Sequence, residues 1–106
     1  MNKLFLITRT TPAGWDEYVS AVVVATSEQD ARVIHPSYPD IHGGTIKWGR
    51  QYDEDMRQTE GWFSPNGELD EYHGWVTPSQ VTAKYIGEAS PTLSLGRVVT
   101  NHFNNG

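Results

Sequence analysis

The sequence predicts an α+β protein with a mainly antiparallel sheet of four or more strands, one short helix packed on it and a long irregular insert. Two observations carry this prediction. Runs rich in β-branched and aromatic residues lie near both ends of the chain, and such runs are typical of strands. One cluster of helix-start signals follows the second run. The 106 residues fit a single domain, 1–106, in which residues of about 37–74 form the insert.

The first two strands are expected over residues 3–8 and 17–26. The first is a short apolar run, and a loop over residues 9–15 with a proline and a glycine follows it. The second contains three consecutive valines, whose branched side chains suit a pleated surface. Its apolar residues fall on both faces, which predicts an inner strand covered on both sides, or on one side by a helix.

The helix is expected over residues 28–35. Ser27 is a good N-cap, and Asp30 stands where a capping box usually has Glu or Gln. Pro36 should end the helix, and His35 would then lie in its last turn, where a cation suits the helix dipole.

Residues 36–80 show little periodicity. Residues 45–48 predict a short strand, and a small hairpin is expected between 62–63 and 68–69 because "SPNG" is strong turn chemistry. Residues 77–80 predict one helical turn. Irregular stretches of this length are often functional, or contain strands without a clear pattern.

The sequence predicts two further strands, over residues 81–89 and 97–103. The first alternates apolar and polar residues, which indicates one buried face. The second is expected to lie at an edge of the sheet, where it could pair two copies of the chain as a homodimer.

Composition narrows the class of protein. Cysteine is absent, which excludes disulfides and thiolate chemistry and suits a reducing compartment. The apolar run near the N-terminus is too short for a signal peptide or a membrane span, so we expect a soluble, cytoplasmic protein with no membrane partner. The net charge is −5, and residues 53–71 hold seven acids and one base. Such a segment repels nucleic acid and attracts basic protein surfaces, unless it only aids solubility.

No catalytic or metal-binding motif is present, so we expect neither an enzyme nor a cofactor or metal. An EF-hand starting at Asp53 would need Gly and Glu where Gln58 and Ser64 stand. The four histidines show no metal-ligand spacing. A small hydrolase using His73 with a nearby carboxylate is the less favoured alternative, because chance supplies such pairs in most proteins.

A basic and aromatic run offers a candidate ligand site. Trp48 and Tyr52 could stack on a nucleotide base, while Lys47 and Arg50 could meet its phosphate. The simpler interpretation of Trp48 is a core residue of a short strand. The other basic residues are scattered, so we expect no direct nucleic-acid binding.

The acidic segment is also aromatic, and this combination is typical of a protein interface or a pocket wall. Some of its rings must anchor the insert, and Trp75 is the best core candidate. The remaining candidates for a partner-binding face are two aromatic anchors and four acids that would meet a basic surface: Trp62, Tyr72, Asp53, Asp55, Asp70 and Glu71.

Three fragments, "LFLITRTTPAGWDEYVSAVVVATSEQDARVIHP", "VTAKYIGEA" and "GRVVTNHFNNG", resemble a family of small uncharacterised accessory proteins encoded by tailed bacteriophages. The resemblance covers roughly half to two-thirds of the chain and leaves out residues 37–74. It implies expression in the cytoplasm of a bacterial host but assigns no activity to any residue. By analogy with small acidic phage proteins, we expect a non-enzymatic inhibitor of a host protein, with an anti-defence role. The alternative is a sponge that sequesters a small nucleotide-type defence signal.

Overall fold

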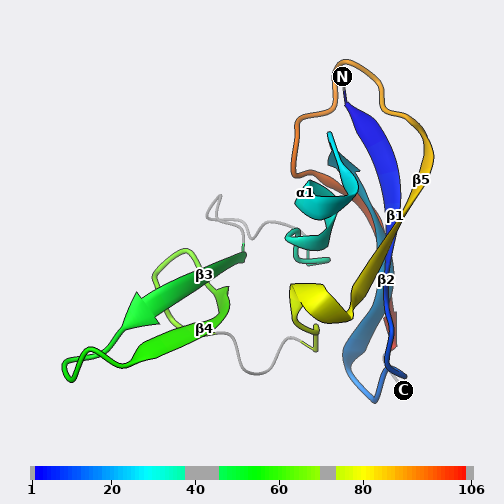
Figure 1. Cartoon of the computed structure of the whole chain (residues 1–106). Helices are drawn as coiled ribbons and strands as arrows, with labels where there is room; N and C mark the ends of the chain where they lie inside the picture. Colours follow the sequence, from blue (N-terminus) through cyan, green and yellow to red (C-terminus); the bar gives the residue numbers. More distant parts are fainter. Residues whose placement is uncertain (1, 38–45, 70–73, 105–106) are drawn as a thin grey trace.

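Four antiparallel strands form the main sheet in a computed structural model that describes residues 2–37, 46–69 and 74–104 (Figure 1). In spatial order they are β5 (Val81–Glu88), β1 (Lys3–Arg9), β2 (Glu17–Ala25) and β6 (Val98–Asn104). The two strands nearest the N-terminus therefore lie inside the sheet, and the two later strands form its edges. This arrangement confirms the predicted α+β class, the inner position of the second strand and the edge position of the last.

The core lies on one face of this sheet. Phe5 and Ile7 of β1 pair with Val23 and Ala21 of β2, and all four side chains are buried. Val81, Val98, Ala25 and Ala31 complete the buried cluster. Since alternate residues of a strand share a face, the same period that predicts the strands also selects these core residues.

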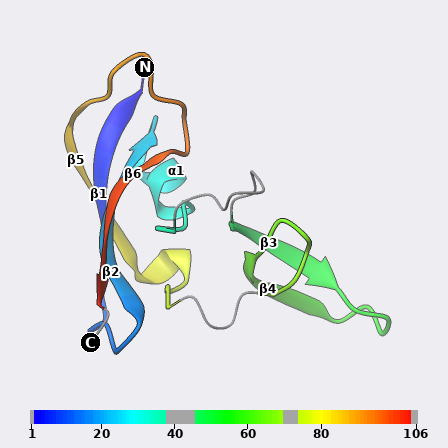
Figure 2. The ribbon, with the colours of Figure 1, turned by 180° about the vertical axis from the view of Figure 1, so that it is seen from behind.

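The helix α1 (Glu28–Arg32) covers this face, and the one-turn helix η1 (Pro78–Gln80) lies on the same side (Figures 1 and 2). Ser27 caps α1, because its hydroxyl accepts a hydrogen bond from the Asp30 N–H at 3.1 Å. The helix ends three residues earlier than predicted. Val33 leaves the helical conformation, and Ile34 then forms a β-bridge with Lys47.

The insert is more regular than predicted. It contains a two-stranded sheet of β3 (Lys47–Tyr52) and β4 (Gln58–Phe63), which projects away from the main sheet (Figure 1). The strand expected over residues 45–48 corresponds to the start of β3. The hairpin expected around "SPNG" is reduced to a single β-bridge between Phe63 and Leu69.

In the part of the chain that the structure describes, no helix lies on the other face of the main sheet (Figures 1 and 2). Leu4, Leu6 and Val22 lie on this face and are half-buried. Among the residues described, no helix has the length and apolar character needed to cross a bilayer.

Candidate binding surfaces

The β3–β4 hairpin presents two different faces. One face carries three cross-strand pairs, Trp48–Trp62, Arg50–Glu60 and Tyr52–Gln58. On the other face Gln51 donates a hydrogen bond to the Gly67 carbonyl at 3.0 Å, and Leu69 lies against Gly61. The turn after β4 therefore covers part of this second face and leaves the first more open.

The tip of the hairpin, residues 53–57, is held by one of the predicted partner-binding acids. Asp53 Oδ1 accepts hydrogen bonds from the backbone N–H groups of Asp55 (2.9 Å) and Arg57 (2.8 Å). Asp53 is thus a turn-forming residue as well as a charged one. Its neighbours are open to solvent, with Met56 75% exposed and Tyr52 60% exposed.

Trp62, predicted as an exposed anchor, is only 5% exposed. Its indole Nε1–H donates to the Val76 carbonyl at 2.9 Å, and its ring meets His35 edge-on at 5.1 Å. These contacts attach the base of the hairpin to the segment before η1 and to the segment after α1. We therefore leave Trp62 out of the candidate surface and treat it as a core residue.

Asp70, Glu71 and Tyr72 were also predicted to bind a partner, and His73 was the histidine of the hydrolase alternative. All four lie outside the described residues. Trp75, the best core candidate, is half-buried and packs against the core cluster.

The four residues of the predicted ligand site separate into two pairs. Arg50 forms an ion pair with Glu60 at 3.6 Å, and Tyr52 lies further along the hairpin towards its tip. Lys47 and Trp48 instead lie at the hairpin's base, where they line a cavity. The sequence alone does not separate these pairs, because the cavity's other walls come from distant parts of the chain.

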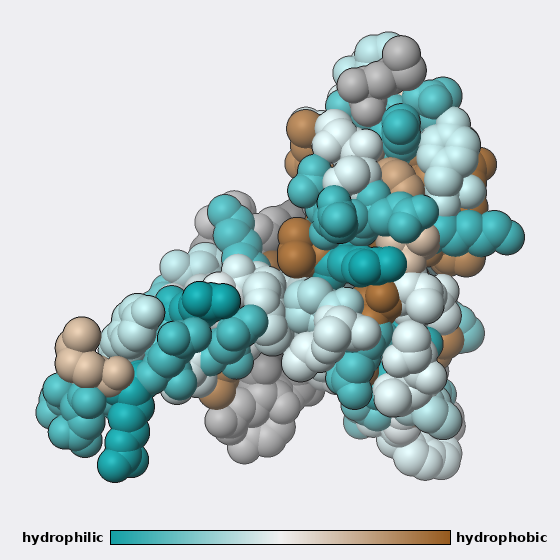
Figure 3. Space-filling model, viewed as in Figure 1, coloured by the Kyte–Doolittle hydropathy of each residue, from teal (hydrophilic) through white to brown (hydrophobic). Residues whose placement is uncertain are grey.

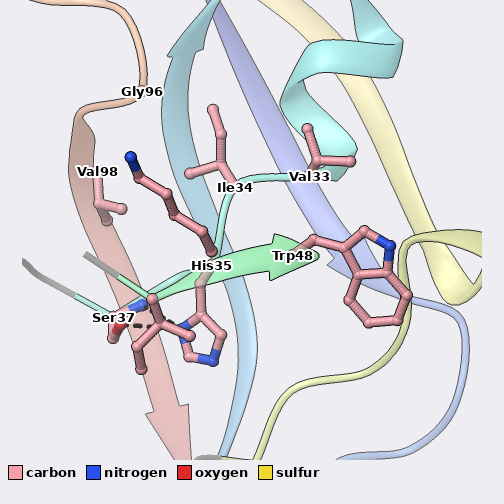
Figure 4. Close-up of a pocket in the computed structure, with 9 residues that line it drawn as sticks. Val33, Ile34, His35, Ser37, Trp48, Gly96 and Val98 are labelled. Atoms are coloured by element: carbon pink, nitrogen blue, oxygen red, sulfur yellow. Dashed lines mark hydrogen bonds between the residues drawn. The ribbon is translucent and has the colours of Figure 1, made fainter. Parts of the chain in front are cut away.

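This cavity has a volume of about 320 Å³ and lies where three segments meet (Figure 4). Val33 and Ile34 come from the segment after α1, Gly96 from the loop before β6, Val98 from the first residue of β6, and Trp48 from β3. Its remaining described lining residues are His35, Ser37, Ile46 and Lys47. A second hollow of about 390 Å³ shares Trp48 and is lined by Glu60, Thr77, Pro78 and Ser79.

Hydrogen bonds hold the walls of the first cavity in place. The Ser37 N–H donates to His35 Nδ1 at 3.1 Å, and the Ser37 hydroxyl lies 2.9 Å from the same nitrogen. Asn101 of β6 donates to the Pro36 carbonyl at 2.8 Å, which ties the segment after α1 to the sheet edge. Trp48 Nε1–H donates to Glu60 at 3.2 Å, which orients its ring. No signal in the sequence links these residues, apart from the "HPS" stretch that ends the helix.

Two further features bear on chemistry. No three histidine, aspartate or glutamate side chains of the described residues lie close enough to hold a metal ion. The Tyr85 hydroxyl donates to Glu88 at 2.8 Å. This hydrogen bond, together with desolvation and the negative charge of Glu88, raises the pKa of Tyr85.

In comparisons with known proteins, no family model, no curated protein and no solved structure matches this chain. The fold and these surfaces are therefore the basis for a functional proposal. They describe an α+β protein with a projecting acidic hairpin and a cavity at the base of that hairpin.

Proposed function

We propose that the protein is a non-enzymatic binding protein that docks on a basic surface of another protein through the tip of the β3–β4 hairpin. The observation that carries this proposal is the exposure of Tyr52 and Met56 beside the acids at the tip. Tyrosine and methionine are enriched in protein interfaces, and a cluster of acids at such a position would steer a basic partner.

The shape of the hairpin supports the same proposal. The space-filling view shows hydrophilic side chains over most of the hairpin, with an apolar group at its far end (Figure 3). Residues 53–57 hold three acids and one base. A projecting element of this kind can enter a concave surface that a flat sheet would not reach.

The resemblance to bacteriophage accessory proteins suggests the kind of partner. In a bacterial cytoplasm, the partner would be a host protein, and inhibition of that protein, including an anti-phage defence protein, is the role we propose. This step is an analogy with other small acidic phage proteins, and it adds no residue to the candidate surface.

Affinity capture from a bacterial lysate, with the protein as bait and mass spectrometry as readout, tests the proposal. The first variant replaces Tyr52 and Met56 by Ser. The second replaces Asp53 by Asn, Glu54 by Gln and Asp55 by Asn, which removes charge but keeps an acceptor oxygen at Asp53 for the turn. Leu95→Ser is the matched control, because Leu95 is 57% exposed and far along the chain from the hairpin.

We expect a protein that is retained by the wild type and by the Leu95 control but lost with the Tyr52 and Met56 variant. Its binding should also weaken with the acid variant and with salt raised to about 1 M, where charges are screened within about 3 Å. A partner that both tip variants retain would rule out the hairpin tip. Absence of any partner would contradict the binding-protein proposal itself.

Sequestration of a small nucleotide-type signal is the second candidate. The cavity at Lys47 and Trp48 favours it, since a small ligand needs a concave site. We rank it second because Arg50 pairs with Glu60 and Tyr52 lies towards the tip, so that only two of the four expected residues line the cavity.

A further inference from the structure

We propose that the cavity at the base of the hairpin binds a small aromatic anion, with its ring against Trp48 and its anionic group at Lys47. This inference rests on the second candidate function and deepens it, because it names the ligand chemistry of the same cavity, and it involves none of the residues at the hairpin tip. It rests on the size of the cavity, the chemistry of its walls and the presence of one lysine among its described lining residues.

The size and walls of the cavity suit a molecule with one ring system. Its volume of about 320 Å³ is at the lower end of the range for ligand sites, which is about 300–1,000 Å³. Val33, Ile34, Ile46 and Val98 supply apolar walls. A molecule with two linked nucleotides would need more space, so a compact ligand is the better match.

Trp48 is prepared to stack on such a ligand. Its hydrogen bond to Glu60 and its edge-to-face contact with Trp62 (5.3 Å between ring centres) restrain the indole from one side. A ring that is already oriented loses little conformational freedom when a ligand binds, which favours affinity. Stacking of a planar group on an aromatic side chain is also tolerant of the ligand's identity.

Lys47 provides the charge. Within the described part of the chain its ammonium group makes no ion pair, whereas Arg50 pairs with Glu60 and Arg9 with Glu17. His35 Nδ1 already contacts the cavity wall itself, since it accepts the Ser37 N–H at 3.1 Å and lies 2.9 Å from the Ser37 hydroxyl. Among the lining residues that the structure describes, Lys47 is the one lysine or arginine and no carboxylate is present. An anionic group is therefore the ligand feature that this site recognises.

Occupancy of the cavity would also affect the hairpin. Lys47 and Trp48 belong to β3, while Ile34 and Val98 belong to the part of the molecule built on the main sheet. A ligand that contacts both would hold the base of the hairpin against the sheet. Amide hydrogen exchange in β3 should slow when the ligand is bound, because opening of the hairpin would require its release.

Calorimetric titration of the whole chain with phenyl phosphate and with adenosine 5′-monophosphate tests the proposal. Phenol, adenosine and inorganic phosphate are the matched probes that lack either the anion or the ring. We expect saturable binding of at least one aromatic anion and much weaker binding of all three partial probes. Binding of phenyl phosphate alone would identify a simple aryl anion, and binding of the nucleotide alone would identify a nucleotide site.

Variants then assign the residues. Lys47→Gln should weaken binding about tenfold or more, since a hydrogen bond to a charged group is lost, while Lys47→Arg should retain most of it. Lys84→Gln is the control, because Lys84 is exposed on β5 and does not line the cavity. Trp48→Leu should also weaken binding. In both Lys47→Gln and Trp48→Leu, addition of the ligand should no longer slow amide hydrogen exchange in β3.

Three outcomes would overturn the proposal. The first is the absence of saturable binding of either aromatic anion up to about 10 mM. The second is equal binding of inorganic phosphate, which would leave the ring without a role. The third is an affinity that Lys47→Gln leaves unchanged, or that Lys84→Gln lowers as much. Because Tyr52 and Met56 are intact in every variant, these outcomes leave the hairpin-docking proposal independently testable.

Discussion

Trp62 is one of the residues that join the hairpin to the rest of the molecule, beside the β-bridge between Ile34 and Lys47. Its buried ring contacts His35 and Trp48, and its indole N–H donates to the Val76 carbonyl. We expect Trp62→Ala to lower the free energy of unfolding by about 3–5 kcal/mol, because a large buried ring is lost and a cavity remains. Trp15→Ala is the control, since Trp15 is 76% exposed and should change stability by less than about 0.5 kcal/mol. Urea denaturation followed by far-UV circular dichroism measures both, and equal effects would contradict the role of Trp62.

Tyr85 gives a pH-dependent prediction at the same scale. Its hydrogen bond to Glu88 raises the phenol pKa above the ordinary value of about 10. A raised pKa means that the folded state holds this proton more tightly than the unfolded state does. The resulting stabilisation is complete below the ordinary pKa and is lost as the pH rises through the folded-state value.

The ultraviolet absorbance of tyrosinate during alkaline titration measures this pKa, with Tyr85→Phe as the reference that identifies the Tyr85 contribution. Glu88→Gln should bring the Tyr85 pKa down towards its ordinary value, because the charged acceptor is lost. An unchanged titration curve in that variant would show that Glu88 has no such effect.

At the scale of elements, Gly74 connects the insert to the end of β1 and the start of β2. Its φ is +63°, and a Cβ here would lie 2.6 Å from the Glu17 Cα. Its carbonyl accepts hydrogen bonds from the Tyr18 N–H and from Arg9. Glycine is therefore needed at position 74 for two reasons: the backbone has a positive φ, and another segment approaches too closely for a Cβ.

We expect Gly74→Ala to destabilise the protein more than Gly96→Ala. Gly96 also has a positive φ, +85°, but a Cβ there would meet nothing within 4 Å. In Gly96→Ala the free energy of unfolding should fall by only about 1–2 kcal/mol, which is the cost of a left-handed conformation for alanine. In Gly74→Ala it should fall further, because the backbone at Glu17 must also move. Thermal and urea unfolding of the two variants give the comparison, and equal losses would show that the contact with Glu17 is easily relieved.

At the scale of the whole molecule, stability is expected to differ between the sheet and the hairpin. β1 and β2 lie inside a four-stranded sheet over a buried core, whereas β3 and β4 form a two-stranded unit buried mainly at Trp62 and Phe63. Two-stranded hairpins are marginally stable alone. Native-state hydrogen exchange should therefore show much lower protection in the hairpin than in the inner strands. The comparison is between the hydrogen-bonded backbone amides of Arg50 or Gln51 and those of Ile7 or Val23. Equal protection would mean that the hairpin opens only with the whole fold.

Local signals in the sequence predict most of the main sheet. Residues 3–8, 17–26, 81–89 and 97–103 correspond to β1, β2, β5 and β6, because their alternating or β-branched patterns act over a few residues. The start of α1 follows from the Ser27 cap for the same reason.

Non-local contacts account for what the sequence does not reveal. The helix ends early because Ile34 pairs with Lys47. The predicted hairpin includes residues 62–63 at the end of β4, but the first residues of β4 are missed because they are polar and gain their order from β3. The cavity is likewise invisible in the sequence, since Ile34, Trp48 and Val98 meet only after folding.

The sequence by itself determined the fold class, the four main strands, the cap of the helix and the acidic character of the hairpin tip. Only the tertiary structure decided the strand order, the burial of Trp62 and the meeting of Lys47 and Trp48 with the segment after α1. The physical reason is range: backbone preferences and side-chain periodicity act between near neighbours. Whether an aromatic ring is buried or exposed depends on which distant carbonyl or side chain folding brings beside it.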